Sequence, residues 1–331
     1  MFSVIIPVYN GEKTIARTLA SLISSKDYIH EVIIVDDHSE DNTILEAEKF
    51  QAFLPIIIMS SDGYHNPGIG RKTGLLAAES DWVTFVDADD CLTPSCLRYV
   101  QQQIDEADNP VLLHSQTIYY ESGTFVPENI GHADNSCGGN FYKRQFLIDN
   151  NLFPHSSLRM AEDEFFNTLI TKYLEYIDDT GAEIIHYDYP VYEVHHDLED
   201  GKSYALSNWV DYLIKYHLLC QIYLTDSLII YEGMEDVLRQ DFENGFIFTY
   251  MLLQGLIADE DENVSEQYQR RHFGKALKYY VNTFNATEDD LIDYYESDPD
   301  NVENYKQGAV GSVGLDFEIS IPFEDFIRGL L

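Results

Sequence analysis

The sequence predicts an α/β fold, a doubly wound and mostly parallel sheet that is followed by a mainly helical C-terminal region. One observation is that short apolar runs alternate four times with helical patterns over the first ~100 residues. The other is that residues 205–297 keep a helical pattern that is rich in Tyr, Leu and Ile and has few Gly or Pro. We therefore expect two domains, residues 1–204 and residues 205–331.

Four apolar runs have the composition of parallel strands that are covered on both faces, and they are residues 2–8, 30–35, 56–59 and 82–86. Helical spacing follows the first three of them, at residues 15–23, 42–50 and 71–78, with a glycine-containing loop at 63–70. Further elements are expected as a strand at 111–120, a short helix at 142–150, a helix that starts near 163, and strands within 176–196. Residues 308–331 are predicted to be a glycine-containing loop and a short apolar segment.

The surface is predicted to be acidic throughout, because the 331 residues carry a net charge of −38. Residues 1–200 contain 34 acids against 11 Lys or Arg, and residues 201–331 contain 24 against 9, so the charge is not confined to a tail. Such a surface opposes non-specific binding to nucleic acid and to anionic membranes. Hydrophobic residues make up 45% of the chain, which is enough for a sizeable core.

The four cysteines have no C-x-x-C pair and no zinc-site spacing, so we expect buried, reduced thiols. The N-terminus enters a strand at once, without the basic segment of a signal peptide. The longest apolar run, residues 246–258, is too short to cross a bilayer. These features predict a cytoplasmic protein without a transmembrane segment.

Three carboxylates, Asp87, Asp89 and Asp90, end the fourth predicted strand. In open α/β sheets the carboxyl ends of the strands form the edge at which ligands bind. Like charges this close together are unfavourable unless a cation or a proton offsets them, and oxygen ligands suit Mg²⁺ or Mn²⁺. The segment therefore indicates a divalent-cation site, and an acidic turn without a metal is the alternative that it leaves open.

Five segments in order resemble the family 2 glycosyltransferases, which have the GT-A fold, and they are residues 2–10, 31–39, 68–74, 85–90 and 161–163. Arg71 matches an arginine of the family's third segment, whereas Gly70 and Lys72 stand where Ala and Asn are usual. The acidic loop resembles the family's Asp-x-Asp motif, and residues 161–163 resemble its later Glu-Asp motif. Residues 205–331 lie outside the resemblance.

The resemblance implies an inverting glycosyltransferase that moves a sugar from a nucleotide diphosphate sugar, with UDP as the expected nucleotide, to a hydroxyl of a glycan or glycoprotein. It implies that Asp163 is the general base and that Glu162 shares this role or only caps its helix. The implied ligands of Mn²⁺ or Mg²⁺ are Asp89 and Asp87. One of His195 and His196, with His195 as the first choice, would be a third ligand or contact the diphosphate. The expected process is the biosynthesis of a cell-surface polysaccharide.

The donor nucleotide is expected to bind where the first two strands end. By the same resemblance, Asp36 would accept a hydrogen bond from a uracil N–H, and Arg71 would meet a phosphate or orient Asp87. The residues expected to contact the donor are Pro7, Val8, Tyr9, Asn10, Asp36, Arg71, Asp87 and Ala88.

Three other functions are weaker hypotheses for residues 1–204. A phosphotransferase of the haloacid-dehalogenase type normally has its Asp-x-Asp after the first strand, and here three strand–helix units come before Asp87. A nucleotidyltransferase would have a Gly-rich, basic loop after the first strand, which residues 10–13 match poorly. A catalytically weak module that binds a sugar nucleotide or a glycan also stays open, although the intact Asp87, Asp89 and Asp163 speak against it.

The C-terminal helices have three open roles: covering the acceptor side of the site, forming a homo-oligomer, or completing a helical core. A local basic patch at Arg270, Arg271, Lys275 and Lys278 stands out in this acidic chain. Such a patch could override the repulsion between the acidic surface and a polyanionic acceptor.

Overall fold

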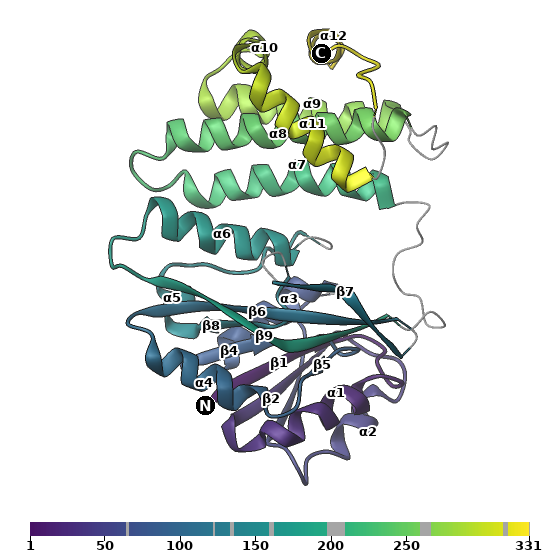
Figure 1. Ribbon diagram of the computed structural model, residues 1–331, viewed down its shortest axis with the longest axis vertical. Helices are drawn as coiled ribbons and strands as arrows, with labels where there is room; N and C mark the ends of the chain where they lie inside the picture. Colours follow the sequence, from purple (N-terminus) through teal and green to yellow (C-terminus); the bar gives the residue numbers. More distant parts are fainter. Residues whose placement is uncertain are drawn as a thin grey trace. The chain divides into compact units, whose positions relative to one another are not determined.

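The computed structural model describes residues 1–63, 66–121, 123–132, 136–158, 162–196, 209–258, 266–313 and 317–330 (Figure 1). The chain divides into two compact units, Met1–Gly201 and Lys202–Leu331. In the described residues the first unit is a sheet covered by helices, and the second contains helices alone. The predicted fold class is thereby confirmed. Residue 161 of the Glu-Asp motif lies outside the described residues.

A nine-stranded sheet forms the centre of the first unit, in the order β3-β2-β1-β4-β8-β6-β9-β5, with β7 paired to β6. Its strands are β1 (Phe2–Val8), β2 (Ile29–Asp36), β3 (Ile56–Ser60), β4 (Trp82–Phe85), β5 (Cys91–Leu92), β6 (Pro110–Glu121), β7 (Thr124–His132), β8 (Asn140–Lys143) and β9 (Glu183–His196). β1 is parallel to β2 and β4, and β2 is parallel to β3, whereas β8 is antiparallel to β4 and β6. Because the first four strands are parallel, their carboxyl ends meet at one edge, where the acidic loop lies.

The helices of the first unit are α1 (Ile15–Leu22), α2 (Thr43–Glu48), α3 (Pro67–Ala77), α4 (Cys96–Glu106), α5 (Arg144–Asp149) and α6 (Glu162–Tyr176). Side chains of β1 alternate between two apolar layers, as the period of a strand requires. Val4 and Ile6 belong to a buried cluster with residues of α1 and α4. Ile5 points to α3, where a Cβ added at Gly74 would lie 2.4 Å from Ile5 Cγ2. Helix α3 therefore lies against the sheet at a distance that only glycine permits.

Helix α3 begins at Pro67, so the loop predicted to extend through Gly70 is wrong. Asn66 caps the helix by accepting a hydrogen bond from the Ile69 N–H at 3.2 Å, and Pro67 occupies the first helical position. The glycines that indicated a loop serve close packing instead, since a Cβ at Gly70 would lie 3.0 Å from the Cβ of Pro7.

Three further features of the structure differ from the sequence-based expectation. Residues 142–143 belong to β8 and not to the helix predicted at 142–150, because their backbone pairs with β4, and that of Tyr142 pairs with β6 as well. Strand β7 was not expected, and it pairs with β6 after a turn at Gly123, whose φ is +76°. Gly308 lies inside a helix, so the loop predicted from that position is also wrong.

The second unit consists of α7 (Trp209–Leu228), α8 (Glu235–Ala258), α9 (Glu266–Phe284), α10 (Glu288–Ser297), α11 (Pro299–Val313) and α12 (Phe323–Arg328). Aromatic rings fill its core, with the Phe273 ring 5.1 Å from that of Phe246 and 4.9 Å from that of Phe326. Buried Glu243 is paired with Arg239 at 2.9 Å and accepts a hydrogen bond from the Tyr280 hydroxyl. The second unit therefore has a hydrophobic core of its own.

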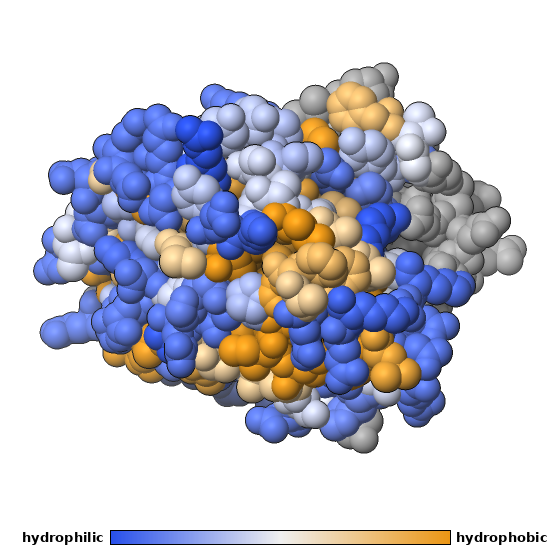
Figure 2. Space-filling view, turned by 90° about the horizontal axis from the view of Figure 1, so that it is seen from below, coloured by the Kyte–Doolittle hydropathy of each residue, from blue (hydrophilic) through white to orange (hydrophobic). Residues whose placement is uncertain are grey.

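Figure 2 shows a face that is mostly hydrophilic, with apolar side chains gathered near its middle, which agrees with the high content of charged residues. The four cysteines are buried and free, as predicted. Across the described ranges, the helices lack the combination of length and apolar character that a bilayer span requires.

Candidate active site

Hydrogen bonds hold the carboxyl ends of β1 and β2 together. The Asn10 N–H donates to Ser39 Oγ at 2.9 Å, and the Ser39 N–H donates to the carboxylate of Asp36 at 3.2 Å. The Asp37 N–H donates to the Val8 carbonyl at 2.8 Å. Asn10 has a φ of +50°, a conformation that asparagine tolerates better than most residues. These contacts place Asp36 beside the end of β1.

The other residues predicted to flank the nucleotide base lie at the same edge. Pro7 and Val8 are the last residues of β1, and Pro7 faces the close approach of α3 at Gly70. The Tyr9 side chain, directly after the strand, is 37% exposed. A planar ligand can therefore reach this edge from solvent.

Helix α1 holds the acidic loop that follows β4. The Thr18 hydroxyl donates to the Ala88 carbonyl at 2.9 Å, and the Arg17 guanidinium donates to the Asp89 carbonyl at 2.7 Å. These contacts fix the backbone and not the carboxylates. The Asp87 side chain is 42% exposed and Asp89 is exposed, so both carboxylates reach the solvent side of the edge.

Asp90 is the buried member of the acidic loop and joins the loop to β9. One carboxylate oxygen accepts a hydrogen bond from the Tyr192 hydroxyl at 2.9 Å, and the other accepts one from the His195 backbone N–H at 2.9 Å. The Tyr192 oxygen in turn accepts a hydrogen bond from the Asp87 N–H at 3.0 Å. Burial raises the pKa of Asp90 to about 8, with the charges of Asp87 and Asp89 adding to the effect.

Tyr192 is a site residue that the sequence-based reasoning missed. It is 1% exposed, and its ring packs directly on Gly138. A Cβ added at Gly138 would lie only 2.6 Å from Tyr192 Cε1. The paired glycines Gly138 and Gly139 were the available signal, because they indicate a place where a large group or another backbone comes close.

Arg71 joins two motifs that lie far apart in the sequence. Its guanidinium donates to Asp87 Oδ1 at 2.8 Å and to Glu162 Oε1 at 2.5 Å, and its side chain is 5% exposed. Both carboxylates offset the buried positive charge through charge-assisted hydrogen bonds to the two terminal nitrogens, whereas Nε is buried without a hydrogen-bond partner among the described residues. The third and fourth motif segments and the Glu-Asp motif therefore form one site.

Asp163 follows Glu162 in the first turn of α6. Burial and the negative charge of Glu162 raise the pKa of Asp163 to about 7, while the positive charge of Arg71 acts in the opposite direction. A carboxyl with a pKa near neutrality is suited to taking and releasing a proton. The helix N-terminus also carries acids favourably, so the position alone does not assign a role.

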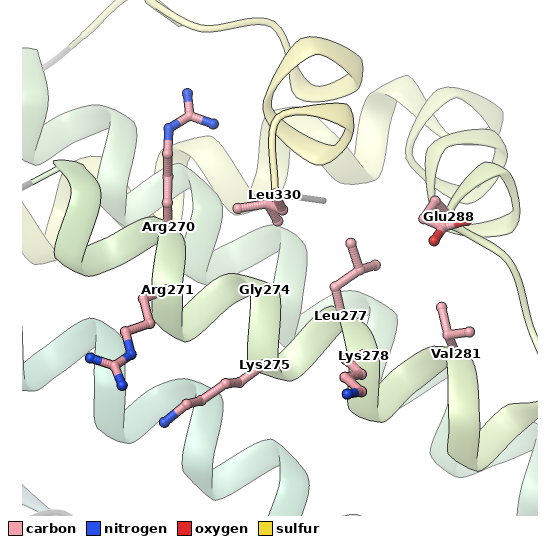
Figure 3. Close-up of a pocket in the computed structure, with 9 residues that line it drawn as sticks. All are labelled: Arg270, Arg271, Gly274, Lys275, Leu277, Lys278, Val281, Glu288 and Leu330. Carbon is pink, nitrogen blue, oxygen red and sulfur yellow. The ribbon is translucent and has the colours of Figure 1, made fainter.

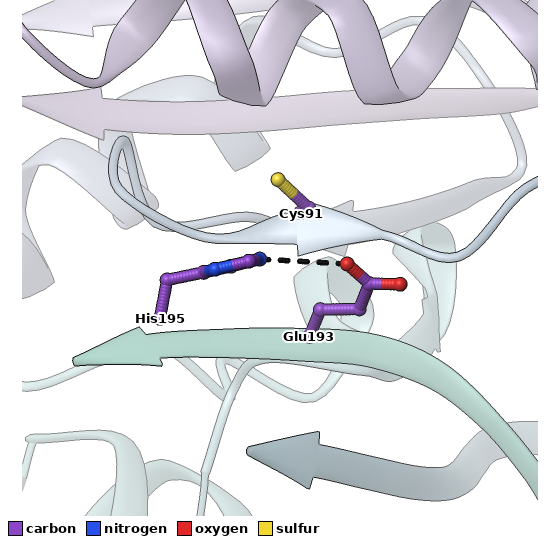
Figure 4. Close-up of side chains that lie close together, drawn as sticks. All are labelled: Cys91, Glu193 and His195. Atoms are coloured by element: carbon purple, nitrogen blue, oxygen red, sulfur yellow. Dashed lines mark hydrogen bonds and ion pairs between the residues drawn. The ribbon is translucent and has the colours of Figure 1, made fainter. Parts of the chain in front are cut away.

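His195 lies with Glu193 and Cys91, as Figure 4 shows. Its Nε2 is 3.4 Å from Glu193 Oε2, and its ring stacks on Tyr120 with 4.8 Å between centroids. Within the described parts of the chain, this is the one group of three candidate ligands whose ligand atoms all lie within 4.8 Å of one another. It does not include Asp87 or Asp89, so the role of His195 as a third ligand beside them stays a prediction.

Replacement of Tyr192 by phenylalanine is expected to destabilise the first unit by about 1–3 kcal/mol and to lower turnover, because the Asp90 carboxylate loses a donor and the Asp87 N–H loses its acceptor. Urea unfolding and kcat test this expectation. Tyr189→Phe on the same strand is the control, since Tyr189 is 44% exposed. Equal stability and kcat in Tyr192→Phe and the control would contradict the role given to the Tyr192 hydroxyl.

Comparison with known proteins matches the sequence profile described as "Glycosyl transferase family 2" to residues 3–170. The chain is 31% identical to the poly(ribitol-phosphate) beta-N-acetylglucosaminyltransferase TarS of Staphylococcus aureus over 182 residues, which cover 50% of this chain and 31% of TarS. It is 25% identical to the poly(ribitol-phosphate) beta-N-acetylglucosaminyltransferase TarP of the same species, over 62% of this chain and 66% of TarP. It is 29% identical to the minor teichoic acid biosynthesis protein GgaA of Bacillus subtilis, over 53% of this chain and 44% of GgaA. The chain thus matches between about a third and two thirds of these relatives' lengths.

The solved structure of S. aureus TarS 1-349 in complex with UDP-GlcNAc has a similar fold, with a TM-score of 0.65 at 22% identity over 94% of this chain and 92% of that one. The likeness extends over both units and confirms the predicted fold class. The matched profile covers more than half of the chain and includes the acidic loop, Arg71 and the start of α6. The chain therefore belongs to glycosyl transferase family 2, the glycosyltransferase class that its motifs predicted.

Proposed function

We propose that this protein transfers N-acetylglucosamine from its UDP derivative to a hydroxyl of a polymer whose repeats are joined by phosphodiesters, with inversion at the anomeric carbon. Family membership supports sugar transfer. The activities for which TarS and TarP are named, and the UDP-GlcNAc bound in the similar TarS structure, support this donor and this acceptor class.

The observation that carries the proposal is the pair of ion pairs at Arg71. Its contacts to Asp87 and Glu162 join the acidic loop to the turn that contains Asp163. Because Arg71 is buried and both of its terminal nitrogens donate to carboxylates, we assign it to orienting Asp87 and not to direct contact with a phosphate.

The donor nucleotide is proposed to bind across the ends of β1 and β2. Asp36 is a suitable acceptor for the uracil N–H, because the Ser39 N–H fixes the position of its carboxylate. The ring of Tyr9 and the backbone of Pro7, Val8 and Asn10 line the same edge and can flank the base.

The acidic loop fits a divalent cation. The carboxylates of Asp87 and Asp89 reach solvent, and their negative charge adds to burial in raising the pKa of buried Asp90 to about 8. A cation offsets such a concentration of negative charge, and carboxylate oxygens suit Mg²⁺ or Mn²⁺. We propose Asp89 as a ligand, with Asp87 as a second ligand or a contact to the ion's water shell. When bound, the ion stabilises the charge of the departing diphosphate.

Asp163 is proposed to take the proton of the acceptor hydroxyl as that oxygen attacks the anomeric carbon. The new bond forms while the bond from that carbon to the diphosphate oxygen breaks, and the electron pair leaves with UDP. One displacement of this kind inverts the configuration. Glu162 is paired with Arg71, which supports a positioning role and leaves Asp163 as the base.

The first test measures UDP release over a panel of UDP-, GDP- and dTDP-sugars, with Mn²⁺ and then with EDTA. We expect slow hydrolysis of UDP-GlcNAc that EDTA abolishes and that Asp89→Ala lowers at least about a hundredfold. Asp108→Ala removes an exposed acid elsewhere and should leave the rate unchanged. A thermal shift with UDP-GlcNAc but no turnover with any acceptor would instead favour a binding module on the same scaffold.

A further inference from the structure

Helix α9 holds a concentration of positive charge in the acidic chain. After residue 200 the sequence contains nine Lys or Arg residues, and four of them lie within nine positions of this helix. They are Arg270, Arg271, Lys275 and Lys278. Residues 267–284 contain no Asp or Glu, although the chain as a whole has 58 acids in 331 residues.

Three of these cations lie on one face of the helix. Arg271, Lys275 and Lys278 are exposed, and their spacing of four and then three residues places them in one row. The row extends for about 10 Å along the helix axis, at 1.5 Å per residue. In the described part of the chain none of the three forms an ion pair with a carboxylate. Figure 3 shows Arg271 and Lys275 extending to the same side of α9.

The row borders a hollow of about 520 Å³ on the surface of the second unit. Leu277, Val281 and Leu330 contribute apolar atoms to its lining. Glu288 belongs to the lining as well, as the first residue of α10. The hollow thus lies beside the exposed positive charge of the row, and Glu288 is the one acid among the described residues of its lining.

The positive potential of this region acts on a neighbouring side chain. The pKa of His272 is lowered to about 4, first by burial and then by the positive charges of Lys215, Lys275 and Arg271. The positive charges add to the effect of burial, which is the larger cause.

Arg270 has a different role from the row. Its guanidinium carbon lies 5.3 Å from the centre of the Phe326 ring, a cation–π contact that joins α9 to α12. In Figure 3 it extends toward the segment that carries Leu330 and away from Arg271. Substituting Arg270 would alter the packing of α9 on α12 as well as the charge.

We propose that Arg271, Lys275 and Lys278, the α9 basic row, bind successive phosphate groups of the acceptor polymer. The proposal rests on the proposed function for its acceptor class. A row of separate cations about 10 Å long matches a flexible chain with one negative charge per repeat, and the hollow beside the row gives such a chain room. A nucleic-acid duplex presents a long, dense charge that the acidic remainder of the surface repels.

Two properties follow from a row that binds several charges at once. The affinity for the acceptor should rise with the number of repeats until the row is filled, because each added phosphate binds within the same complex. It should also fall as salt increases, since neutralised phosphates release their counterions. A single-repeat acceptor should show little of either effect.

The variant Arg271→Gln/Lys275→Gln/Lys278→Gln removes three charges and keeps residues that favour helices. We expect it to raise KM about tenfold for a polyol-phosphate octamer and to leave KM for the monomer nearly unchanged. Donor hydrolysis without acceptor should stay at the wild-type rate. The matched control, Lys26→Gln/Lys49→Gln/Arg98→Gln, removes three exposed cations of the first unit and should leave all these values unchanged.

Equal KM values for the octamer in the α9 variant and the control would overturn the proposal, as would a KM that does not depend on the number of repeats. Tighter binding of a charge-matched single-stranded RNA than of the octamer would also overturn it and point to nucleic acid. If the wild type releases no UDP at all, the proposed function fails, and fluorescence anisotropy with labelled octamer still tests the row. Loss of octamer binding in the α9 variant alone would then support a polyanion site without transferase activity.

Discussion

Replacement of Asp163 by asparagine is expected to lower kcat by about a thousandfold, within the 10²–10⁴ range of a lost general base. The wild-type kcat/KM should rise with pH and reach half its maximum near pH 7, because the pKa of Asp163 is raised to about 7 and only the carboxylate accepts a proton. The asparagine variant should lack this rise. Initial rates of UDP release with acceptor, measured from pH 5 to 9, give both results.

Stability separates this catalytic role from a helix-capping role. A carboxyl whose pKa is higher in the folded state than its ordinary 3.8 favours folding at low pH, and this contribution is lost as pH rises from about 4 through about 7. Asp163→Asn should therefore be at least as stable as the wild type at pH 8, while a helix that needed the acid would be weakened. Glu164→Gln, in the same turn, is the control for kcat and should retain activity. A rate loss shared by the control would argue against Asp163 as the base.

Replacement of Arg71 by methionine is expected to destabilise the first unit by about 3–5 kcal/mol, the usual result of leaving a buried charge without its partner. Glu162 is the residue left behind, since its side chain is 7% exposed. Asp87 is more solvated and contributes less. Urea unfolding followed by the fluorescence of Trp82, in a background with Trp209→Phe, reports on the first unit.

Two further variants separate the buried charge from general packing. Adding Glu162→Gln to Arg71→Met should restore part of the lost stability, because the uncompensated charge is then gone. Arg144→Met removes a guanidinium that donates to the carbonyls of Leu75 and Leu76 and to no carboxylate of the described residues, so it should cost about 1 kcal/mol. If Arg71→Met costs no more than Arg144→Met, the two ion pairs do not have the structural weight given to them here.

The sequence predicted the parts of the site that depend on local pattern. The acids after β4 and β2 could be placed at one edge, because buried parallel strands align their carboxyl ends. The partner of Arg71 in α6 could not be derived, since 91 positions separate Arg71 from Glu162 and no local periodicity records that approach. The resemblance to the family supplied the motif, and the structure supplied the contact.

The role of β9 depends on register, which sequence pattern did not reveal. Glu193 and His195 share one face of the strand and Tyr192 faces the other, because side chains alternate along a strand. Because Cys91 pairs with Glu193, the His195 imidazole lies beside the Cys91 thiol and the Glu193 carboxylate. The Tyr192 hydroxyl, on the other face, reaches Asp90. A shift of one residue would exchange these neighbours. The glycines in α3 misled the prediction for a related reason, since close contact with β1 and not chain flexibility explains them.

The close seating of α3 on β1 also affects how a mutational scan of this enzyme should be interpreted. Any side chain at Gly74 would have to displace Ile5, and one at Gly70 would press on Pro7. Substitution at Gly74 should therefore abolish activity as thoroughly as loss of an acidic residue, although this glycine takes no part in chemistry. Alanine at Gly70 should cost less, because its contact with Pro7 is less close and alanine is usual there in the family. Loss of activity in variants of α3 can therefore result from displacement of the helix that carries Arg71. Measuring the amount of folded protein alongside activity distinguishes such packing defects from the loss of a catalytic group.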